Sequence, residues 1–146
     1  MKRLHVHVSV EAMEPAIAFY SALFDQQPTV AKSDYAKWEV DDPRVNLAIS
    51  QRCGNAPGVN HLGIQAGDEA ELGELHERLG RADIASLPEE GAHCCYATGN
   101  KHWAADPSAV IWEMFHTMGE AATYGEDSGP QPAVPASTHP TSGGCC

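Results

Sequence analysis

The sequence contains two similar halves, and this internal repeat constrains the fold more than any other feature. When the segment that begins at His5 is laid on the segment that begins at His61, 56 residues later, apolar residues fall on apolar residues. The matches are Val8 on Ile64, Phe19 on Leu75 and Leu23 on Leu79. In each half an alternating, strand-like run leads into apolar residues at three- and four-residue spacing, which indicates a helix. The repeat therefore predicts two modules that each begin with a strand and a helix.

Each half is also predicted to end on a strand. Asp42-Pro43 precedes residues 45–50 and Asp106-Pro107 precedes residues 110–115, and proline in such a pair marks a turn. Amphipathic spacing places the helices at residues 15–24 and 69–80. Their core faces are predicted to carry Ile17, Phe19, Tyr20, Leu23, Leu72, Leu75 and Leu79.

Three residues with metal-binding side chains stand at corresponding places in the two halves. These are His5, His61 and Glu113, and matching the final strands places Ala48 opposite Glu113. The fourth equivalent position therefore has no coordinating side chain. Two imidazoles and one carboxylate are the ligand set with which non-haem Fe(II) enzymes leave positions open for O2 and substrate. An open site of this kind indicates catalysis more than a structural role.

His7 is an alternative to His5, because residues two apart on a strand face the same side. Laying His7 on His61 instead would place Phe19 on a glycine, so the repeat favours His5. Each histidine taken alone is interpreted more simply as a hydrogen-bonded residue of the inner sheet face. Glu113 interrupts an apolar strand, where a charge is costly unless it is paired or bound to a metal. An edge strand with Glu113 facing water is the alternative.

Cys94 and Cys95 are adjacent and lie among polar and glycine residues that favour a loop. In a loop both thiols can reach one atom, whereas on a strand they would point to opposite faces. Buried small apolar residues are the alternative, since cysteine often has that role. His93, Lys101 and His102 lie nearby and are candidates for orienting a substrate, or ordinary polar loop residues.

Five segments resemble the vicinal oxygen chelate superfamily, and within it the ArsI/CadI group. They are residues 1–8, 34–38, 57–65, 94–97 and 106–117. The resemblance spans residues 1–125 and implies an α+β fold of two paired βαβββ modules, at about residues 1–52 and 58–118, in a half-open barrel around a metal. The adjacent cysteines are its most restrictive part.

The resemblance implies a dioxygenase that uses Fe(II) and O2 to cleave the carbon–arsenic bond of trivalent organoarsenicals and release arsenite, a detoxification reaction. His5, His61 and Glu113 would hold the iron. Cys94 and Cys95 would hold the arsenic of a methyl or aryl compound, because trivalent arsenic is soft and binds thiols.

Tyr35, Lys101 and His102 are predicted as further substrate contacts. Tyr35 and Trp38 share a predicted strand, and both are interpreted either as cavity wall beside an aryl group or as core.

Two other functions are compatible with these residues. The first is sequestration of Cd(II) or As(III) without turnover, as in the cadmium-induced branch of the same group. The second is a glyoxalase-like enzyme that uses Zn(II), Ni(II) or Mn(II) as a Lewis acid without a redox step. Release of arsenite coupled to O2 consumption separates the dioxygenase from the first, and activity without O2 would indicate the second.

Charge and composition limit the partners. The net charge of -11 argues against nucleic acid and anionic membrane surfaces, which would be repelled. The chain opens without a signal peptide pattern and has no apolar run long enough to span a bilayer, so we expect a cytoplasmic location. Its five cysteines would be thiols there. A monomer and a homodimer are both compatible with two modules in one chain.

Residues 126–146 are rich in Pro, Gly, Ser and Thr and are expected to form a flexible tail. The tail ends in Cys145-Cys146, a second adjacent pair. We hypothesise that this pair captures arsenic or cadmium. Unchanged turnover at limiting substrate after deletion of residues 128–146 would exclude that role.

Overall fold

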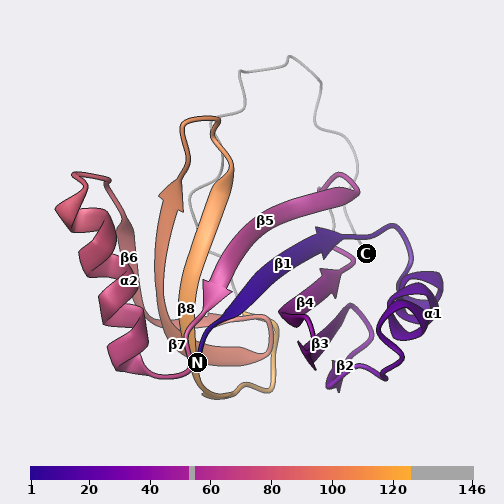
Figure 1. Ribbon diagram of the computed structural model, residues 1–146. Helices are drawn as coiled ribbons and strands as arrows, with labels where there is room; N and C mark the ends of the chain where they lie inside the picture. The colour runs from indigo at the N-terminus through magenta and orange to yellow at the C-terminus, as the bar shows by residue number, and fades with distance from the viewer. Residues whose placement is uncertain (53–54, 126–146) are drawn as a thin grey trace.

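The computed structural model describes residues 1–52 and 55–125, which form one sheet and two helices (Figure 1). The first half consists of β1 (Arg3–Ser9), α1 (Met13–Phe24), β2 (Val30–Ala31), β3 (Tyr35–Asp41) and β4 (Arg44–Ser50). The second half consists of β5 (Gly58–Gln65), α2 (Glu69–Arg81), β6 (Leu87–Cys94), β7 (Ala97–Ala105) and β8 (Ile111–Glu120). Both halves have the order βαβββ, which confirms the predicted α+β fold of two paired modules.

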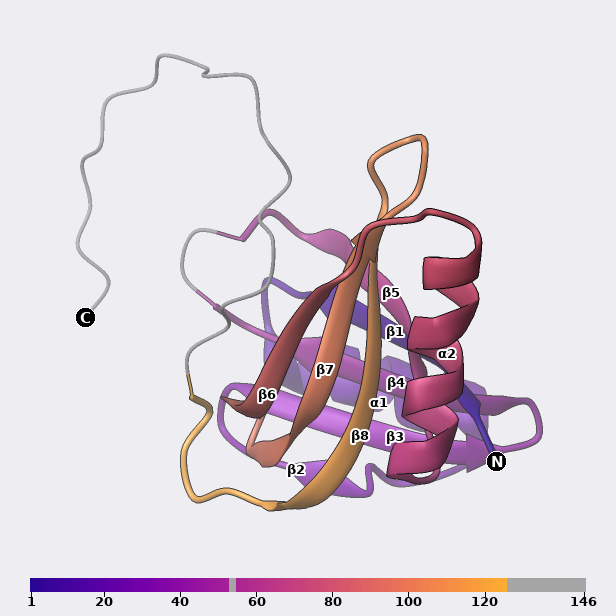
Figure 2. The ribbon, with the colours of Figure 1, turned by 90° about the vertical axis from the view of Figure 1, so that its left-hand side faces the viewer.

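The eight strands form a single curled sheet in the order β2-β3-β4-β1-β5-β8-β7-β6. Within each module the first and last strands run parallel, β1 beside β4 and β5 beside β8. The antiparallel pair β1 and β5 joins the modules at the centre. The two helices lie at opposite ends of the sheet (Figures 1 and 2). Among the described residues, neither helix has the length and apolar character needed to cross a membrane.

The strand register reproduces the 56-residue repeat seen in the sequence. Val6 pairs with Leu47 in the first module, and Leu62 pairs with Trp112 in the second. Leu62 is the residue 56 positions after Val6, so the two occupy the same place in their parallel pairs.

The central pair of strands shows the same relation. His5 pairs with Gly63 and His7 pairs with His61. Adding 56 to His5 gives His61 and subtracting 56 from Gly63 gives His7, so exchanging the two modules turns the first pair into the second, as expected for two copies related by a twofold rotation. His5 and His61 therefore occupy equivalent positions, and His7 faces His61 directly across the sheet.

Helix α1 packs with only part of the predicted face. Phe19 and Leu23 each expose 61% of their surface, so their assignment to the core is wrong. Tyr20 packs as predicted, with its ring against Trp38 of β3 and ring centroids 5.8 Å apart. The same cluster contains Met13, Ile17 and Phe24. Two apolar stripes with the same spacing run along this helix, and spacing alone does not decide which one faces the sheet.

Helix α2 packs as predicted. Leu72 and Leu75 are buried, and Leu79 joins them against Met114 of β8. The helix begins after Asp68, whose side chain accepts a hydrogen bond of 2.8 Å from a backbone N–H of the first turn. This cap satisfies a donor that has no partner within the helix.

Gly63 lies between His5 on β1 and Glu113 on β8 in the sheet register. A methyl group at this position would collide with the backbone carbonyl of Glu113. Gly63→Ala is therefore expected to push β5 away from β8 and to lower the free energy of unfolding by about 1–3 kcal/mol. Urea denaturation measures this loss. Gly73→Ala on α2 is the control, because an added methyl there meets nothing within 4 Å. Equal midpoints for the two variants would contradict the close approach at Gly63.

Candidate metal centre

Four ionisable side chains converge on the concave face of the central strands. They are His5 and His7 on β1, His61 on β5 and Glu113 on β8, each exposing 5% of its surface or less. One ring nitrogen from each histidine lies within 4.8 Å of those of the other two. Glu113 Oε2 lies 3.3 Å from His61 Nε2 and 3.6 Å from His5 Nε2. Strand alternation produces this convergence, because residues two apart share a face.

Hydrogen bonds fix the orientation of two of the imidazoles. His5 Nδ1 lies 3.0 Å from the backbone oxygen of Asn46, and His61 Nδ1 lies 2.8 Å from the side-chain oxygen of Asn60. Carbonyl oxygens only accept, so each Nδ1 donates its proton and each Nε2 keeps a lone pair. His61 Nε2 is buried without a hydrogen-bond partner among the described residues, since its contact with Glu113 lacks hydrogen-bond geometry. Metal-ligating histidines are oriented in this way.

Burial keeps the histidines of β1 neutral. It lowers the pKa of His5 to about 4 and the pKa of His7 well below its usual value, although the Glu113 charge acts in the opposite direction. Neutral imidazole is the form that binds metals. Burial alone would raise the pKa of Glu113, but the Lys101 charge and the neighbouring imidazoles outweigh it and hold that pKa far below normal. At neutral pH the site therefore offers the neutral imidazoles of His5 and His7 and the Glu113 carboxylate.

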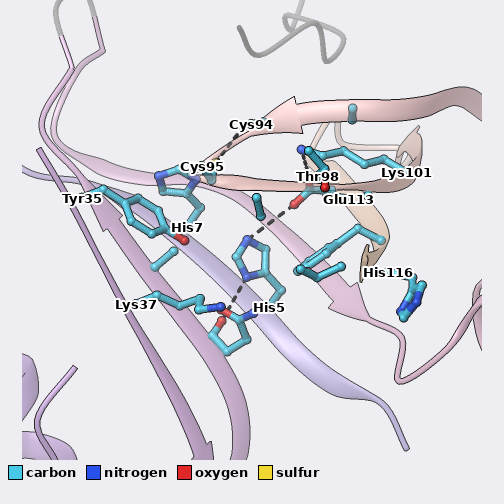
Figure 3. A pocket seen from close by; sticks show the side chains of 17 residues that line it. His5, His7, Tyr35, Lys37, Cys94, Cys95, Thr98, Lys101, Glu113 and His116 are labelled. Atoms are coloured by element: carbon cyan, nitrogen blue, oxygen red, sulfur yellow. Dashed lines mark hydrogen bonds and ion pairs between the residues drawn. The ribbon is translucent and has the colours of Figure 1, made fainter. Parts of the chain in front are cut away.

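Lys101 holds one oxygen of the Glu113 carboxylate. Its Nζ lies 2.6 Å from Glu113 Oε1, and the lysine exposes 8% of its surface. Burial opposes the charge on Lys101, but the carboxylate more than compensates and raises the pKa of the lysine. In Figure 3 the His5 ring points toward the same carboxylate that Lys101 reaches. The ion pair with Lys101 occupies Glu113 Oε1 and leaves Oε2 directed at the imidazoles.

Lys101→Met is expected to destabilise the metal-free protein by about 3–5 kcal/mol, because it leaves Glu113 as an unpaired buried charge. Adding Glu113→Gln should restore most of that stability, since it removes the charge. Urea denaturation in the presence of a chelator measures both. Arg78→Met is the matched control, since its ion pair with Glu74 is exposed and should contribute less than about 1 kcal/mol. Similar small losses for Lys101→Met and Arg78→Met would contradict the buried pair.

His7 and His5 both lie in the cluster. The position of the side chains therefore does not decide which of the two histidines is the metal ligand. His7 Nε2 lies 2.9 Å from the Ser50 hydroxyl, a side-chain hydrogen bond inside the site. Two ligand sets are consistent with this geometry. One consists of His5, His61 and Glu113, and the other replaces the carboxylate by His7.

Cys94 and Cys95 form the turn of the hairpin between β6 and β7. Cys94 pairs with Ala97, and the two residues between them, Cys95 and Tyr96, have φ angles of 59° and 60°. Positive φ at both central residues is the geometry of a type I′ turn. The turn brings the two sulfur atoms to 2.8 Å, close enough to bind one atom together. Neighbouring residues of a strand point to opposite faces. Cys95 lies outside the strand, so its side chain is not forced away from that of Cys94.

A cavity of about 50 Å³ connects the two groups of candidate ligands (Figure 3). Its wall includes His5, His7 and Glu113 on one side and the adjacent pair Cys94 and Cys95 on another. The same cavity is therefore lined by nitrogen and oxygen donors and by two thiols, while His61 is not among its lining residues.

The other predicted substrate contacts are distributed differently. Tyr35 and Lys101 line the cavity. Trp38 is fully buried against α1 and belongs to the core. His102 does not reach the cavity, because it follows Lys101 on β7 and adjacent strand residues face opposite sides. Its ring stacks on His76 of α2, with centroids 4.4 Å apart.

Two aromatic residues beside the candidate ligands were not predicted from the sequence. The ring of Phe115 lies 5.0 Å from the ring of His5. A signal for it exists, because Phe115 follows Glu113 by two positions on one strand. The hydroxyl of Tyr124 lies 3.4 Å from the sulfur of Cys95. No local pattern predicts this contact, since Tyr124 belongs to a segment that folds back over the hairpin after β8.

The sequence matches a family model and several known proteins. The model described as the Glyoxalase/Bleomycin resistance protein/Dioxygenase superfamily matches residues 2–114. The trivalent organoarsenical cleaving enzyme of Bacillus sp. strain MD1 is 36% identical over 148 residues, which cover 100% of this chain and 83% of the relative. The cadmium-induced protein CadI of Mycobacterium tuberculosis is 33% identical over 131 residues, which cover 90% and 85%.

Solved structures share the fold at lower identity. The 2,3-dioxygenase LapB from Pseudomonas sp. KL28 aligns with a TM-score of 0.60 at 18% identity, over 82% of this chain and 42% of that one. The Mn(II)-bound glyoxalase from Novosphingobium aromaticivorans aligns with a TM-score of 0.56 at 14% identity, over 87% and 43%.

Proposed function

The chain belongs to the Glyoxalase/Bleomycin resistance protein/Dioxygenase superfamily, and on that basis we propose that it is an Fe(II)-dependent dioxygenase that cleaves the carbon–arsenic bond of trivalent organoarsenicals. One observation carries the proposal. A single small cavity has imidazole and carboxylate donors on one side and two thiols, 2.8 Å apart, on another. Relatives with 32% and 36% identity are named trivalent organoarsenical cleaving enzymes, which supports the choice of substrate.

His5, His61 and Glu113 would hold the iron. The two Nε2 lone pairs and Glu113 Oε2 already converge, with the carboxylate oxygen 3.3 and 3.6 Å from the two nitrogens. These are the donors that Fe(II) oxygenases use. When bound, Fe(II) supplies the redox chemistry with O2 at the positions that three protein ligands leave open. Lys101 keeps Glu113 ionised and fixed.

Cys94 and Cys95 would hold the arsenic. Trivalent arsenic is soft, so thiols are its preferred ligands, and the type I′ turn presents both sulfurs together. Binding exchanges the two hydroxyl groups of methylarsenite for two cysteine sulfurs and releases two waters. The organic group is then directed from Cys94 and Cys95 into the cavity toward the imidazoles. This chemistry requires reduced thiols, so a cytoplasmic location is part of the proposal.

The reaction balances without a further reductant when the organic group is methyl. One methylarsenite and one O2 become one arsenite and one formaldehyde. The carbon loses four electrons, O2 accepts them, and arsenic stays trivalent throughout. The role of the protein is to hold the carbon next to the metal ligands and to keep the thiols on the arsenic.

Sequestration of Cd(II) or As(III) without turnover is the second candidate function. It is favoured by the similarity to CadI and by His7, which adds a third imidazole to the cluster. A glyoxalase-like reaction without redox chemistry is the third, and it would proceed without O2.

Oxygen uptake tests the proposal against both alternatives. With Fe(II) and methylarsenite, we expect one O2 consumed for each arsenite formed. Stoichiometric binding of the arsenical with no oxygen uptake would support sequestration. Product formation under strict anaerobiosis would support the non-redox enzyme.

A further inference from the structure

The segment that follows β8 packs against the turn that carries the two thiols. The backbone N–H of Ala121 donates a hydrogen bond of 2.7 Å to the carbonyl oxygen of Tyr96. Four residues later, Gly125 forms an antiparallel β-bridge with Cys94. Backbone contacts on both sides of Tyr124 therefore hold this segment against the turn.

Tyr124 is the residue of this segment that reaches a thiol. The Cys95 thiol donates a hydrogen bond to the hydroxyl oxygen of Tyr124, which lies 3.4 Å from the sulfur. The Tyr124 ring contacts the rings of Tyr35 and Tyr96, with centroids 5.8 and 5.7 Å away. The guanidinium carbon of Arg52 lies 3.9 Å from the centre of the same ring. These contacts leave Tyr124 only 8% exposed and fix its hydroxyl beside the sulfur.

Cys95 is the thiol that an arriving arsenical meets first. The cavity that holds both thiols is continuous with an outer cavity of about 300 Å³, because five residues, Cys95 among them, belong to both walls. Cys94 is buried and lines only the inner part, whereas Cys95 is half-buried and lies where the two parts meet. The first arsenic–sulfur bond is therefore expected on the sulfur that Tyr124 contacts.

Each arsenic–sulfur bond requires a proton to move. The thiol loses its proton and the arsenic loses a hydroxyl group, and the two leave together as water. Direct transfer would pass through a strained four-membered ring of sulfur, arsenic, oxygen and hydrogen. A hydroxyl group beside the sulfur avoids that strain, because it accepts the thiol proton and donates its own to the leaving oxygen. Burial raises the pKa of Tyr124, and the neighbouring cysteines raise it further, so its hydroxyl stays protonated and ready to donate.

We propose that Tyr124 is the proton-transfer residue of arsenical capture, taking the proton of the Cys95 thiol while giving its own to the hydroxyl group that leaves arsenic. One S–H and one As–O bond break, one As–S bond and one O–H bond of water form, and Tyr124 ends unchanged. Arsenic stays trivalent throughout. This inference rests on the proposed function and adds a catalytic residue to its binding step. A relay lowers the barrier equally in both directions, so it changes the rates of capture and release and not the affinity.

Tyr124→Phe tests the relay, because it removes the hydroxyl and keeps the ring. The full-length protein is mixed rapidly with methylarsenite under anaerobic conditions, so that no turnover follows, and the adduct is quantified by mass spectrometry. In the variant kon and koff should both fall by about 100-fold, while Kd stays the same. Tyr96→Phe is the matched control and should slow capture far less, since the Tyr96 hydroxyl donates to Asp34 Oδ1, 2.6 Å away, and not to a sulfur.

Three results in Tyr124→Phe would overturn the proposal and leave the proposed function intact. They are unchanged rates, a weaker affinity with unchanged kon, and slowing no greater than in Tyr96→Phe. Absence of any adduct in the wild-type protein would instead contradict the proposed function itself, and this inference with it.

A measurement on the wild-type protein decides the question if Tyr124→Phe does not fold. The relay moves two protons together, so kon should fall along a curve as the fraction of D2O in the solvent rises. Direct transfer moves one proton, so a straight line would overturn the relay.

Discussion

Replacing Cys94 or Cys95 by serine is expected to lower kcat/KM for methylarsenite by about 1,000-fold or more, equivalent to about 4 kcal/mol of transition-state stabilisation. A serine hydroxyl is a hard ligand and does not replace a thiol on trivalent arsenic. Serine is close to cysteine in size, so the variant should retain the turn with its positive φ at Cys95. The loss should therefore appear in arsenic binding and turnover and not in thermal stability.

The control for this experiment is Cys53→Ser, at a cysteine that lies outside the described residues. The measurements are arsenic bound per protein after gel filtration, and the rate of arsenite release. If Cys94→Ser kept half of the wild-type rate, arsenic would have to be held elsewhere. The account of the dithiol turn would then fail.

The second large effect is expected at the metal. Glu113→Gln should weaken Fe(II) binding by about 100-fold or more, because it removes the carboxylate that completes the ligand set. It also leaves Lys101 without its counter-charge, so the variant should be studied alongside Glu113→Gln/Lys101→Met, which removes both charges. Anaerobic titration with Fe(II) measures the affinity of each protein.

His7→Gln is the matched comparison, because His7 lies in the same cluster but is hydrogen-bonded to Ser50 through Nε2. If the iron is held by His5, His61 and Glu113, the change at His7 should weaken binding by less than about tenfold. A greater loss of affinity in His7→Gln than in Glu113→Gln would assign the metal to three imidazoles. It would also favour sequestration over oxygen chemistry.

The strand positions of the site follow from the sequence with little extra information. Period-two alternation and the repeat place His5 and His61 at equivalent positions on one concave face, and the register observed for Val6 and Leu62 agrees. The position of Glu113 follows from the same matching of final strands. The positions of these three residues depend on backbone geometry, and each of the two modules contains the pattern that predicts that geometry.

Other parts of the site depend on tertiary contacts that no local pattern contains. The two apolar stripes of α1 are equivalent in spacing, so the choice of Tyr20 over Phe19 is made by packing against Trp38. The flanking residues favour a loop at Cys95 and Tyr96, but the turn there uses positive φ without glycine or asparagine, so the sequence carries no signal for the turn type.

We propose that iron and the thiol pair act together on one arsenical, and a single turnover after anaerobic reconstitution is the sharpest test. The protein is loaded with Fe(II) and methylarsenite, O2 is added, and arsenic species and formaldehyde are quantified. We predict one arsenite and one formaldehyde per site, with neither product from the Cys94→Ser protein or from the metal-free protein. Recovery of unchanged methylarsenite from the loaded wild-type protein after O2 addition would contradict the claim.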